Sequence, residues 1–168
     1  EKSMKKFVYI IVCLWLVLIC SFVLKQEFTL KTGKEVLLKT VPVDPRDLLR
    51  GDYVILNYEV AQIPPYFRDY GENKTVYVML RVDKKNVAHF AGITDKKPKT
   101  LFLKGRTGNC QTTIPFFRSG RCVSYGIESY FVKEGTGRGL EKDLRNGALV
   151  KVAIDKNGNA KVKGFVQK

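Results

Sequence analysis

The chain has 168 residues, of which 30 are basic and 16 acidic, so its formal net charge at pH 7 is +14. This length fits one compact domain, because the roughly 144 residues after a hydrophobic start can bury a core without the help of a metal or partner. A single histidine and the lack of a Cys-x-x-Cys pair argue against a zinc site and against Cys-His catalysis. We therefore expect no metal and no cofactor.

Residues 7–24 read FVYIIVCLWLVLICSFVL, 18 residues without a charge. At about 1.5 Å per helical residue, this run just crosses a hydrocarbon layer of roughly 30 Å. Lys5 and Lys6 precede it, so the positive-inside tendency predicts a single-pass anchor with residues 1–6 in the cytoplasm. A cleaved signal peptide is the alternative, although no small-x-small site follows the run.

Beyond the anchor, we expect a polar connector at residues 25–35 and an extracytoplasmic domain at residues 36–168, in the periplasm or on the cell surface. Without Lys2, Lys5, Lys6 and Glu1, the remaining chain has 27 basic and 15 acidic residues, a net charge of +12. Such a charge favours anionic lipids, anionic envelope polymers or an acidic protein as partners. A surface that lysine merely keeps soluble would have the same composition. The expected topology argues against nucleic acid.

Alternating apolar residues predict that the domain is built mainly of strands. Residues 53–60 form the first long run, with Val54, Leu56, Tyr58 and Val60 on the core face, and residues 75–82 repeat the design. Shorter runs occupy residues 100–103, 112–117, 123–132, 149–154 and 160–166. The Asn-Gly pair at residues 157–158 favours a hairpin between the last two.

One short helix is expected at residues 140–146, where Glu141 and Arg145 have i,i+4 spacing and Gly147 provides a stop. A short helical turn is also expected between Pro45 and Gly51. Many short strands with little helix predict a mostly β fold, a small β-barrel or β-sandwich of about eight strands.

Residues 51–58 read Gly-Asp-Tyr-Val-Ile-Leu-Asn-Tyr, which is the pattern GDYxxLxY. The chain resembles the GDYXXLXY family of bacterial membrane-anchored proteins, which has no established activity. Segments at residues 42–50, 102–106, 125–135 and 150–165 also look like those of the family, so the resemblance covers most of the exported domain. It implies a single-pass anchor, an envelope location and a multi-pass membrane protein as partner.

The motif has a structural and a functional interpretation. In the structural one, Gly51 permits a turn, Asp52 accepts backbone N–H bonds there, and Leu56 with Tyr58 fills the core. In the functional one, Arg50, Asp52 and Tyr58 line a polar site with Glu128, Tyr130 and Glu134. The other motif residues of this candidate site are Gly51, Tyr53 and Leu56. The structural interpretation is favoured.

An acid/base pair made of Glu128 and Glu134 is disfavoured by spacing. Six residues of straight strand separate them by about 20 Å, against the 5 to 10 Å or so used by paired-carboxylate hydrolases. We therefore expect an accessory binding domain rather than an enzyme, with a membrane protein or an anionic envelope component as partner. An envelope enzyme that uses Asp52, Glu128 and Glu134 is the alternative.

Two cysteines, Cys110 and Cys122, lie outside the apolar run, in a compartment that permits oxidation. They are predicted to form a disulfide, and two free thiols in a reducing setting are the alternative. Cys13 and Cys20 lie inside the run and need no function there.

The disulfide is tested by alkylating the denatured chain before and after reduction and counting the adducts by mass. We expect two adducts before reduction, at Cys13 and Cys20, and four afterwards. Reduction should also lower the free energy of unfolding by about 3 kcal/mol, because the bond closes a short loop. Four adducts without reductant would show that the bond is absent.

Overall fold

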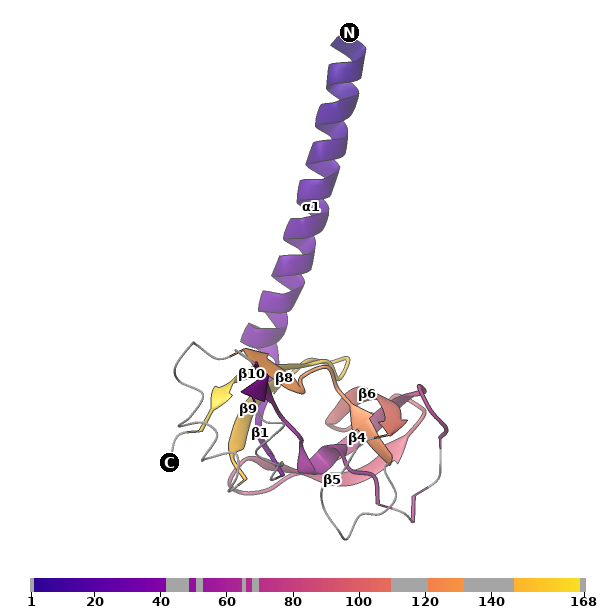
Figure 1. Cartoon of the computed structure of the whole chain (residues 1–168), viewed down its shortest axis with the longest axis vertical. Coiled ribbons are helices and arrows are strands. Elements are labelled where there is room, and N and C mark those ends of the chain that lie inside the picture. The colour runs from indigo at the N-terminus through magenta and orange to yellow at the C-terminus, as the bar shows by residue number, and fades with distance from the viewer. Residues whose placement is uncertain are drawn as a thin grey trace.

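The computed structural model describes residues 2–41, 49–50, 53–64, 66–67, 70–109, 121–131 and 147–166. These residues form one long helix and a mostly β domain, from which the helix rises (Figure 1). The mostly β fold predicted from alternation is confirmed.

Helix α1 (Lys2–Thr32) contains a stretch, Met4–Phe22, that is long and apolar enough to cross a membrane. The helix does not end with the apolar run but continues through most of the expected connector to Thr32. Gly33 alone separates it from strand β1 (Lys34–Lys39). The helix therefore passes into the sheet almost directly.

The larger sheet has seven strands in the order β10-β9-β1-β5-β4-β6-β7. Its strands, besides β1, are β4 (Thr75–Val82), β5 (Val87–Thr94), β6 (Phe102–Asn109), β7 (Arg121–Ser124), β9 (Leu149–Ile154) and β10 (Ala160–Phe165). The β1–β5 pair is parallel and the other pairs are antiparallel. A smaller sheet has the order β2-β3-β8, formed by β2 (Leu49–Arg50), β3 (Tyr53–Ile55) and β8 (Ser129–Phe131).

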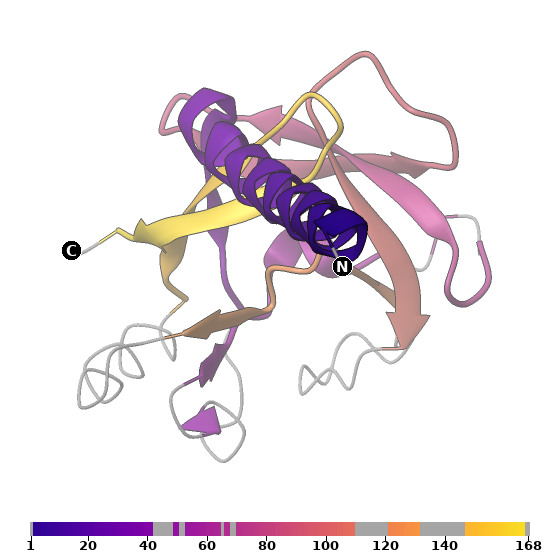
Figure 2. The same cartoon turned by 90° about the horizontal axis from the view of Figure 1, so that it is seen from above.

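The larger sheet curls into a half-barrel, as the view from above shows (Figure 2). Strands β1, β5 and β4 stand between β9 and β6 in the sheet order, yet the β9–β10 turn contacts β6. There the Lys104 N–H donates to the Gly158 carbonyl at 2.8 Å. Near it, Lys97 Nζ donates to Asn157 Oδ1 at 3.0 Å. The predicted hairpin between the last two strands is confirmed, and its turn holds the curl.

The core lies on the concave side of this sheet and has the predicted alternation. In β4, Val76, Val78 and Leu80 are buried, while Val82 is half-buried. Strands β1 and β9 add further apolar side chains from their own inward positions, namely Val36, Leu38, Val150, Val152 and Ile154. Burial of this apolar surface is the main stabilising contribution, at about 25 cal/mol per Å².

The strand predicted at residues 53–60 is shorter than expected, because its backbone changes partners. β3 ends at Ile55, after which the Leu56 N–H donates to the Glu128 carbonyl at 2.7 Å. The Asn57 carbonyl then accepts from the Val41 N–H at 2.8 Å, and a 3₁₀ turn, η1 (Glu59–Ala61), follows. The predicted core face is nevertheless right, since its four side chains are at most 2% exposed: Val54, Leu56, Tyr58 and Val60.

Other boundaries differ for local reasons. The run at 123–132 divides into β7 and β8, because Gly126 turns the chain between them with a φ of 77°. Strand β5 was not predicted, since a register shift opposite Met79 and Leu80 interrupts its alternation. The run at 100–103 overlaps the longer β6 only at residues 102 and 103. The predicted strand at 112–117 and helix at 140–146 lie outside the described residues.

The structure describes only one of the two cysteines predicted to form a disulfide, Cys122. No disulfide joins two described residues, and Cys13 and Cys20 are free. Cys122 is buried in β7 opposite Gly108 of β6. Cys110 follows β6 directly in sequence and lies outside the described residues, so its pairing with Cys122 stays a prediction.

Replacing Gly158 with alanine should destabilise the domain by about 2 to 4 kcal/mol, measured by thermal unfolding of the full chain in detergent. Gly158 has a φ of 79°, and a Cβ there would meet the Phe102 ring and, at 2.8 Å, the Lys104 nitrogen. Gly71→Ala is the control, because its φ of 74° imposes similar strain in open space. Equal losses in the two variants would mean that the turn does not hold the curl.

Candidate functional site

The GDYxxLxY motif begins in a β-hairpin. Strands β2 and β3 pair antiparallel, with Arg50 opposite Tyr53 and Leu49 opposite Val54. Only Gly51 and Asp52 separate the strands in sequence, and a two-residue connection that starts with glycine is typical of tight hairpins. The helical turn expected here is therefore wrong for Leu49 and Arg50, because their backbone pairs as a strand. Gly51 and Asp52 themselves lie outside the described residues.

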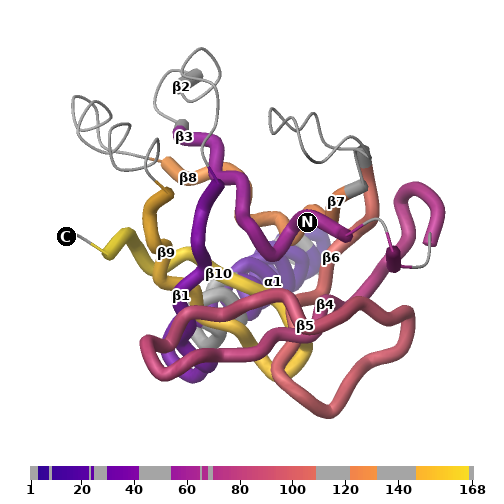
Figure 3. Tube along the Cα trace, turned by 90° about the horizontal axis from the view of Figure 1, so that it is seen from below, coloured from indigo at the N-terminus to yellow at the C-terminus, as the bar shows by residue number. Residues whose placement is uncertain are grey.

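Strand β8 continues this small sheet on the other side of β3 (Figure 3). Tyr53 pairs with Phe131 and Val54 pairs with Tyr130. The register thus puts Arg50, Tyr53 and Phe131 in one row across the three strands. Phe131 is 60% exposed, whereas Val54, from the alternate row, is buried in the core.

Two buried tyrosines fasten the motif segment to the turn before β8. The Tyr58 hydroxyl donates to the Ile127 carbonyl at 2.9 Å, and the Tyr125 hydroxyl donates to the Val60 carbonyl at 2.7 Å. Each segment therefore supplies a tyrosine to the backbone of the other. We call these two hydrogen bonds the tyrosine clasp.

The Glu128 carboxylate accepts hydrogen bonds from the backbone of the same turn. Its Oε1 accepts from the Tyr125 N–H, and its Oε2 accepts from the Gly126 N–H at 2.9 Å. Both carboxylate oxygens are thus used by backbone donors. This geometry gives Glu128 a structural role and leaves it poorly placed for general acid or base chemistry.

Burial, with a smaller contribution from the nearby Glu128 charge, raises the pKa of Tyr58 far above its ordinary value. The same two causes, in the same order, raise the pKa of Tyr125. Both phenols are therefore neutral at physiological pH and act as hydrogen-bond donors. A buried phenol of this kind does not serve as a base.

The predicted polar site is only partly assembled in the described residues. Leu56, Tyr58 and Glu128 come together around the turn, but each has a structural role there. Leu56 packs in the core, Tyr58 forms part of the tyrosine clasp, and Glu128 accepts backbone hydrogen bonds within the turn. The half-buried Tyr130 packs edge-on against Phe165, with ring centroids 5.1 Å apart. The side chains of Arg50 and Tyr53, together with Gly51, Asp52 and Glu134, lie outside what the structure describes.

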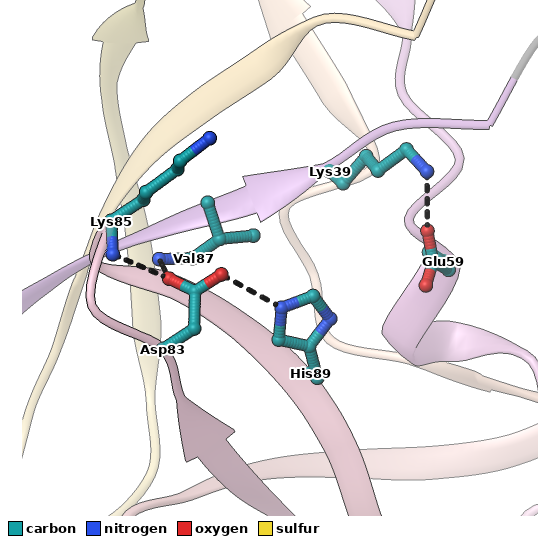
Figure 4. A network of polar contacts seen from close by, with 6 residues as sticks. All are labelled: Lys39, Glu59, Asp83, Lys85, Val87 and His89. Carbon is teal, nitrogen blue, oxygen red and sulfur yellow. Dashed lines mark hydrogen bonds and ion pairs between the residues drawn. The ribbon is translucent and has the colours of Figure 1, made fainter.

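A polar network at the β4–β5 turn was not predicted (Figure 4). Asp83 Oδ1 accepts from the N–H groups of Lys85 and Val87 at 2.8 and 2.9 Å, and Oδ2 lies 3.2 Å from His89 Nε2. The Val87 N–H bond, followed by the His89 contact, lowers the pKa of Asp83. Asp155 accepts in the same way from Asn157 and Asn159. In the sequence, each of these aspartates is the first residue of a turn rich in lysine and asparagine, and this pattern could have indicated their role. Asp83 and Asp155 are both turn-forming residues.

Among the described residues, no three His, Cys, Asp or Glu side chains are grouped so that they could hold a metal ion. In this part of the chain, every buried side-chain polar atom also has a hydrogen-bond partner. The described residues thus define a class of protein: a mostly β domain, whose described buried polar side-chain atoms are all hydrogen-bonded, on a helix that is apolar enough to cross a membrane.

The family can now be stated. The model of the family described as "GDYXXLXY protein" matches residues 15–165, so the chain belongs to this family. No curated protein and no solved structure matches it. The match spans the C-terminal half of α1 and nearly the whole β domain, which confirms the resemblance read from the motif.

Removing the clasp hydroxyls should weaken the fold in a pH-dependent way. Tyr58→Phe and Tyr125→Phe should each cost about 1 to 2 kcal/mol at pH 7, because each leaves a buried carbonyl without its donor. In the wild-type chain, the raised pKa values stabilise the fold fully below about pH 10, the ordinary value for tyrosine, and this stabilisation is lost as the pH rises further. Chemical denaturation between pH 8 and 11 measures both effects.

The double variant Tyr58→Phe/Tyr125→Phe should lose stability less steeply above pH 10 than the wild type does. Tyr66→Phe is the matched control, because Tyr66 is 81% exposed. Removing its hydroxyl should change neither the free energy of unfolding at pH 7 nor the slope of stability against pH above pH 10. Parallel alkaline slopes for the wild type and the double variant would contradict burial as the cause.

Proposed function

We propose that this chain is an accessory binding domain of the bacterial envelope. Helix α1 anchors it in the membrane with residues 1–6 in the cytoplasm and the β domain on the extracytoplasmic side. There the domain binds an integral membrane protein. It has no catalytic chemistry of its own in this proposal.

The observation that carries the proposal is the stiff connection between anchor and domain. Eight helical residues, 25–32, follow the uncharged run at residues 7–24, and they add about 12 Å of helix before β1 begins. Helix α1 also contacts β9 and β10 at its base. A domain held this way reaches partners in or just above the bilayer, whereas binding a soluble ligand would not require a fixed height.

The engagement of the described polar groups supports binding rather than catalysis. Of the three carboxylates that the enzyme alternative would use, Glu128 is occupied by two backbone N–H groups. Asp52 and Glu134 lie outside the described residues. Strand β8, which carries the exposed Phe131, lies at the end of the domain from which α1 rises (Figure 1), where a membrane-embedded partner is within reach.

Site-specific photo-crosslinking in the native membrane tests this proposal. A photoreactive residue in place of Phe131 should give one discrete adduct with an integral membrane protein. The same residue in place of the exposed Lys84, on the β4–β5 turn, should not give that adduct. If position 131 gives no protein adduct, or adducts with soluble proteins only, the proposed partner class is wrong.

The topology is tested separately with a membrane-impermeant amine reagent. In intact spheroplasts the reagent should modify Lys84 and Lys85, which are exposed on the β domain, and should spare Lys5 and Lys6 until the cells are lysed. The opposite pattern would place the domain in the cytoplasm.

A further inference from the structure

The outer face of strands β1, β9 and β10 has a strong excess of positive charge. Together these strands contain five lysines and a single acidic residue, Glu35. Lys151 stands opposite Leu37 and Gly164, and Lys161 and Glu35 both stand opposite Ala153. The neighbouring positions Val150, Val152 and Ile154 belong to the core, so Lys151, Lys161 and Glu35 share the outer face.

The single carboxylate on this face is already compensated. Glu35 Oε1 accepts from Lys163 Nζ, and the bond to Lys163, with the further charge of Lys151, lowers the pKa of Glu35. Among the described residues, no carboxylate lies within ion-pair distance of Lys151 or Lys161. Lys39, at the far end of β1, instead pairs with Glu59 at 3.1 Å. We call Lys151, Lys161 and Lys163 the lysine face.

The lysine face adjoins the base of the helix. Ala153 is on the outer face between Glu35 and Lys161, yet it is fully buried. Helix α1 contacts both β9, which contains Ala153, and β10. Viewed from above, β10 passes beneath α1 on the side from which the helix rises (Figure 2). Lys31 at the end of α1 and Lys34 at the start of β1 are exposed close by and add two further positive charges.

The distance of the lysine face from the membrane surface is short enough for contact with lipid headgroups. The roughly 12 Å of helix beyond residue 24 must first pass an interfacial layer of about 5 to 7 Å. An upright helix would then hold the face about 5 to 7 Å above the headgroups, which is within one Debye length of about 8 Å, and an ordinary helix tilt of about 20° moves part of it closer. A lysine side chain adds further reach.

We propose that the lysine face binds the anionic phospholipid headgroups of the membrane in which α1 is anchored. Juxtamembrane lysines of this kind are attracted to acidic lipids through their phosphates, with a range set by the Debye length. The interaction makes the second contact between domain and bilayer, and with the helix it sets the orientation in which the domain meets its partner. The inference depends on the anchoring in the proposed function but not on the protein partner.

Lysine footprinting of the purified full chain in lipid nanodiscs tests the proposal without any partner present. The discs contain either neutral phosphatidylcholine alone or the same lipid with 30% phosphatidylglycerol, a ratio on the order of natural anionic contents. Acetylation rates at single lysines are read by mass spectrometry. In anionic discs Lys151, Lys161 and Lys163 should react at least about three times more slowly than in neutral ones, and 0.5 M salt should abolish this difference, since it shortens the Debye length.

Internal and mutational controls separate this effect from a general slowing of the reaction. Lys84 and Lys85, exposed on the turn that leads into β5, should react equally in both kinds of disc. The variant Lys151→Gln/Lys161→Gln keeps the Lys163–Glu35 pair, and its remaining nearby lysines, Lys31, Lys34 and Lys163, should lose most of their lipid-dependent protection. The variant Lys84→Gln/Lys85→Gln removes the same charge and should keep that protection.

Equal rates in the two kinds of disc would overturn the proposal, as would equal protection at Lys84 and Lys85. Protection by soluble polyphosphate in neutral discs, without protection by phosphatidylglycerol, would also overturn it and would point to an anionic polymer. None of these results bears on the crosslink from position 131, so the protein partner and the lipid contact can fail independently.

Discussion

The tyrosine clasp is the interaction on which the arrangement of the two sheets depends. The chain leaves β3 at Ile55, crosses to the larger sheet, and is fastened to the turn before β8 by hydroxyls of Tyr58 and Tyr125. Without those bonds, two backbone carbonyls in the core would be buried with no donor, which costs more than an ordinary hydrogen bond contributes. The Leu56 N–H bond to Glu128 adds a third link between the same two segments. The small sheet is therefore joined to the half-barrel by a few buried polar contacts set in apolar packing.

This arrangement gives a structural reason for several amino acids of the motif. Leu56 and the final Tyr58 are buried, and Tyr58 supplies half of the clasp. Tyr53, by contrast, pairs with Arg50 and Phe131 in the row that alternates with the buried Val54. The Gly-Asp pair stands where two strands are joined by two residues, a place that favours glycine for steric reasons. Of the residues of the family's defining string whose side chains are described, Leu56 and Tyr58 thus serve core packing and the tyrosine clasp.

How much could be predicted follows from the range of each interaction. Burial at Val54, Leu56, Tyr58 and Val60 was predictable, because a strand's alternation is local. The end of β3 at Ile55 was not, since it depends on donors and acceptors from Val41 and Glu128, distant in sequence. Strand β5 was missed because its register shift lies in its pairing with β4. The role of Glu128 was open for the same reason: a straight strand was assumed there, and Gly126 turns the chain instead.

The helix and the lysine face make most sense together. An anchor alone leaves a domain free to rotate about its helix axis and to tilt, and a flexible connector would add translation. Gly33 alone stands between α1 and β1, and α1 also contacts β9 and β10, so tilt of the helix and orientation of the domain are coupled. In the proposed lipid contact, attraction of Lys151 and Lys161 toward an acidic bilayer would therefore orient the whole domain, including β8 and its exposed Phe131. The net positive charge, which by itself left anionic partners and mere solubility open, is thereby linked to one face of the domain beside the end of α1.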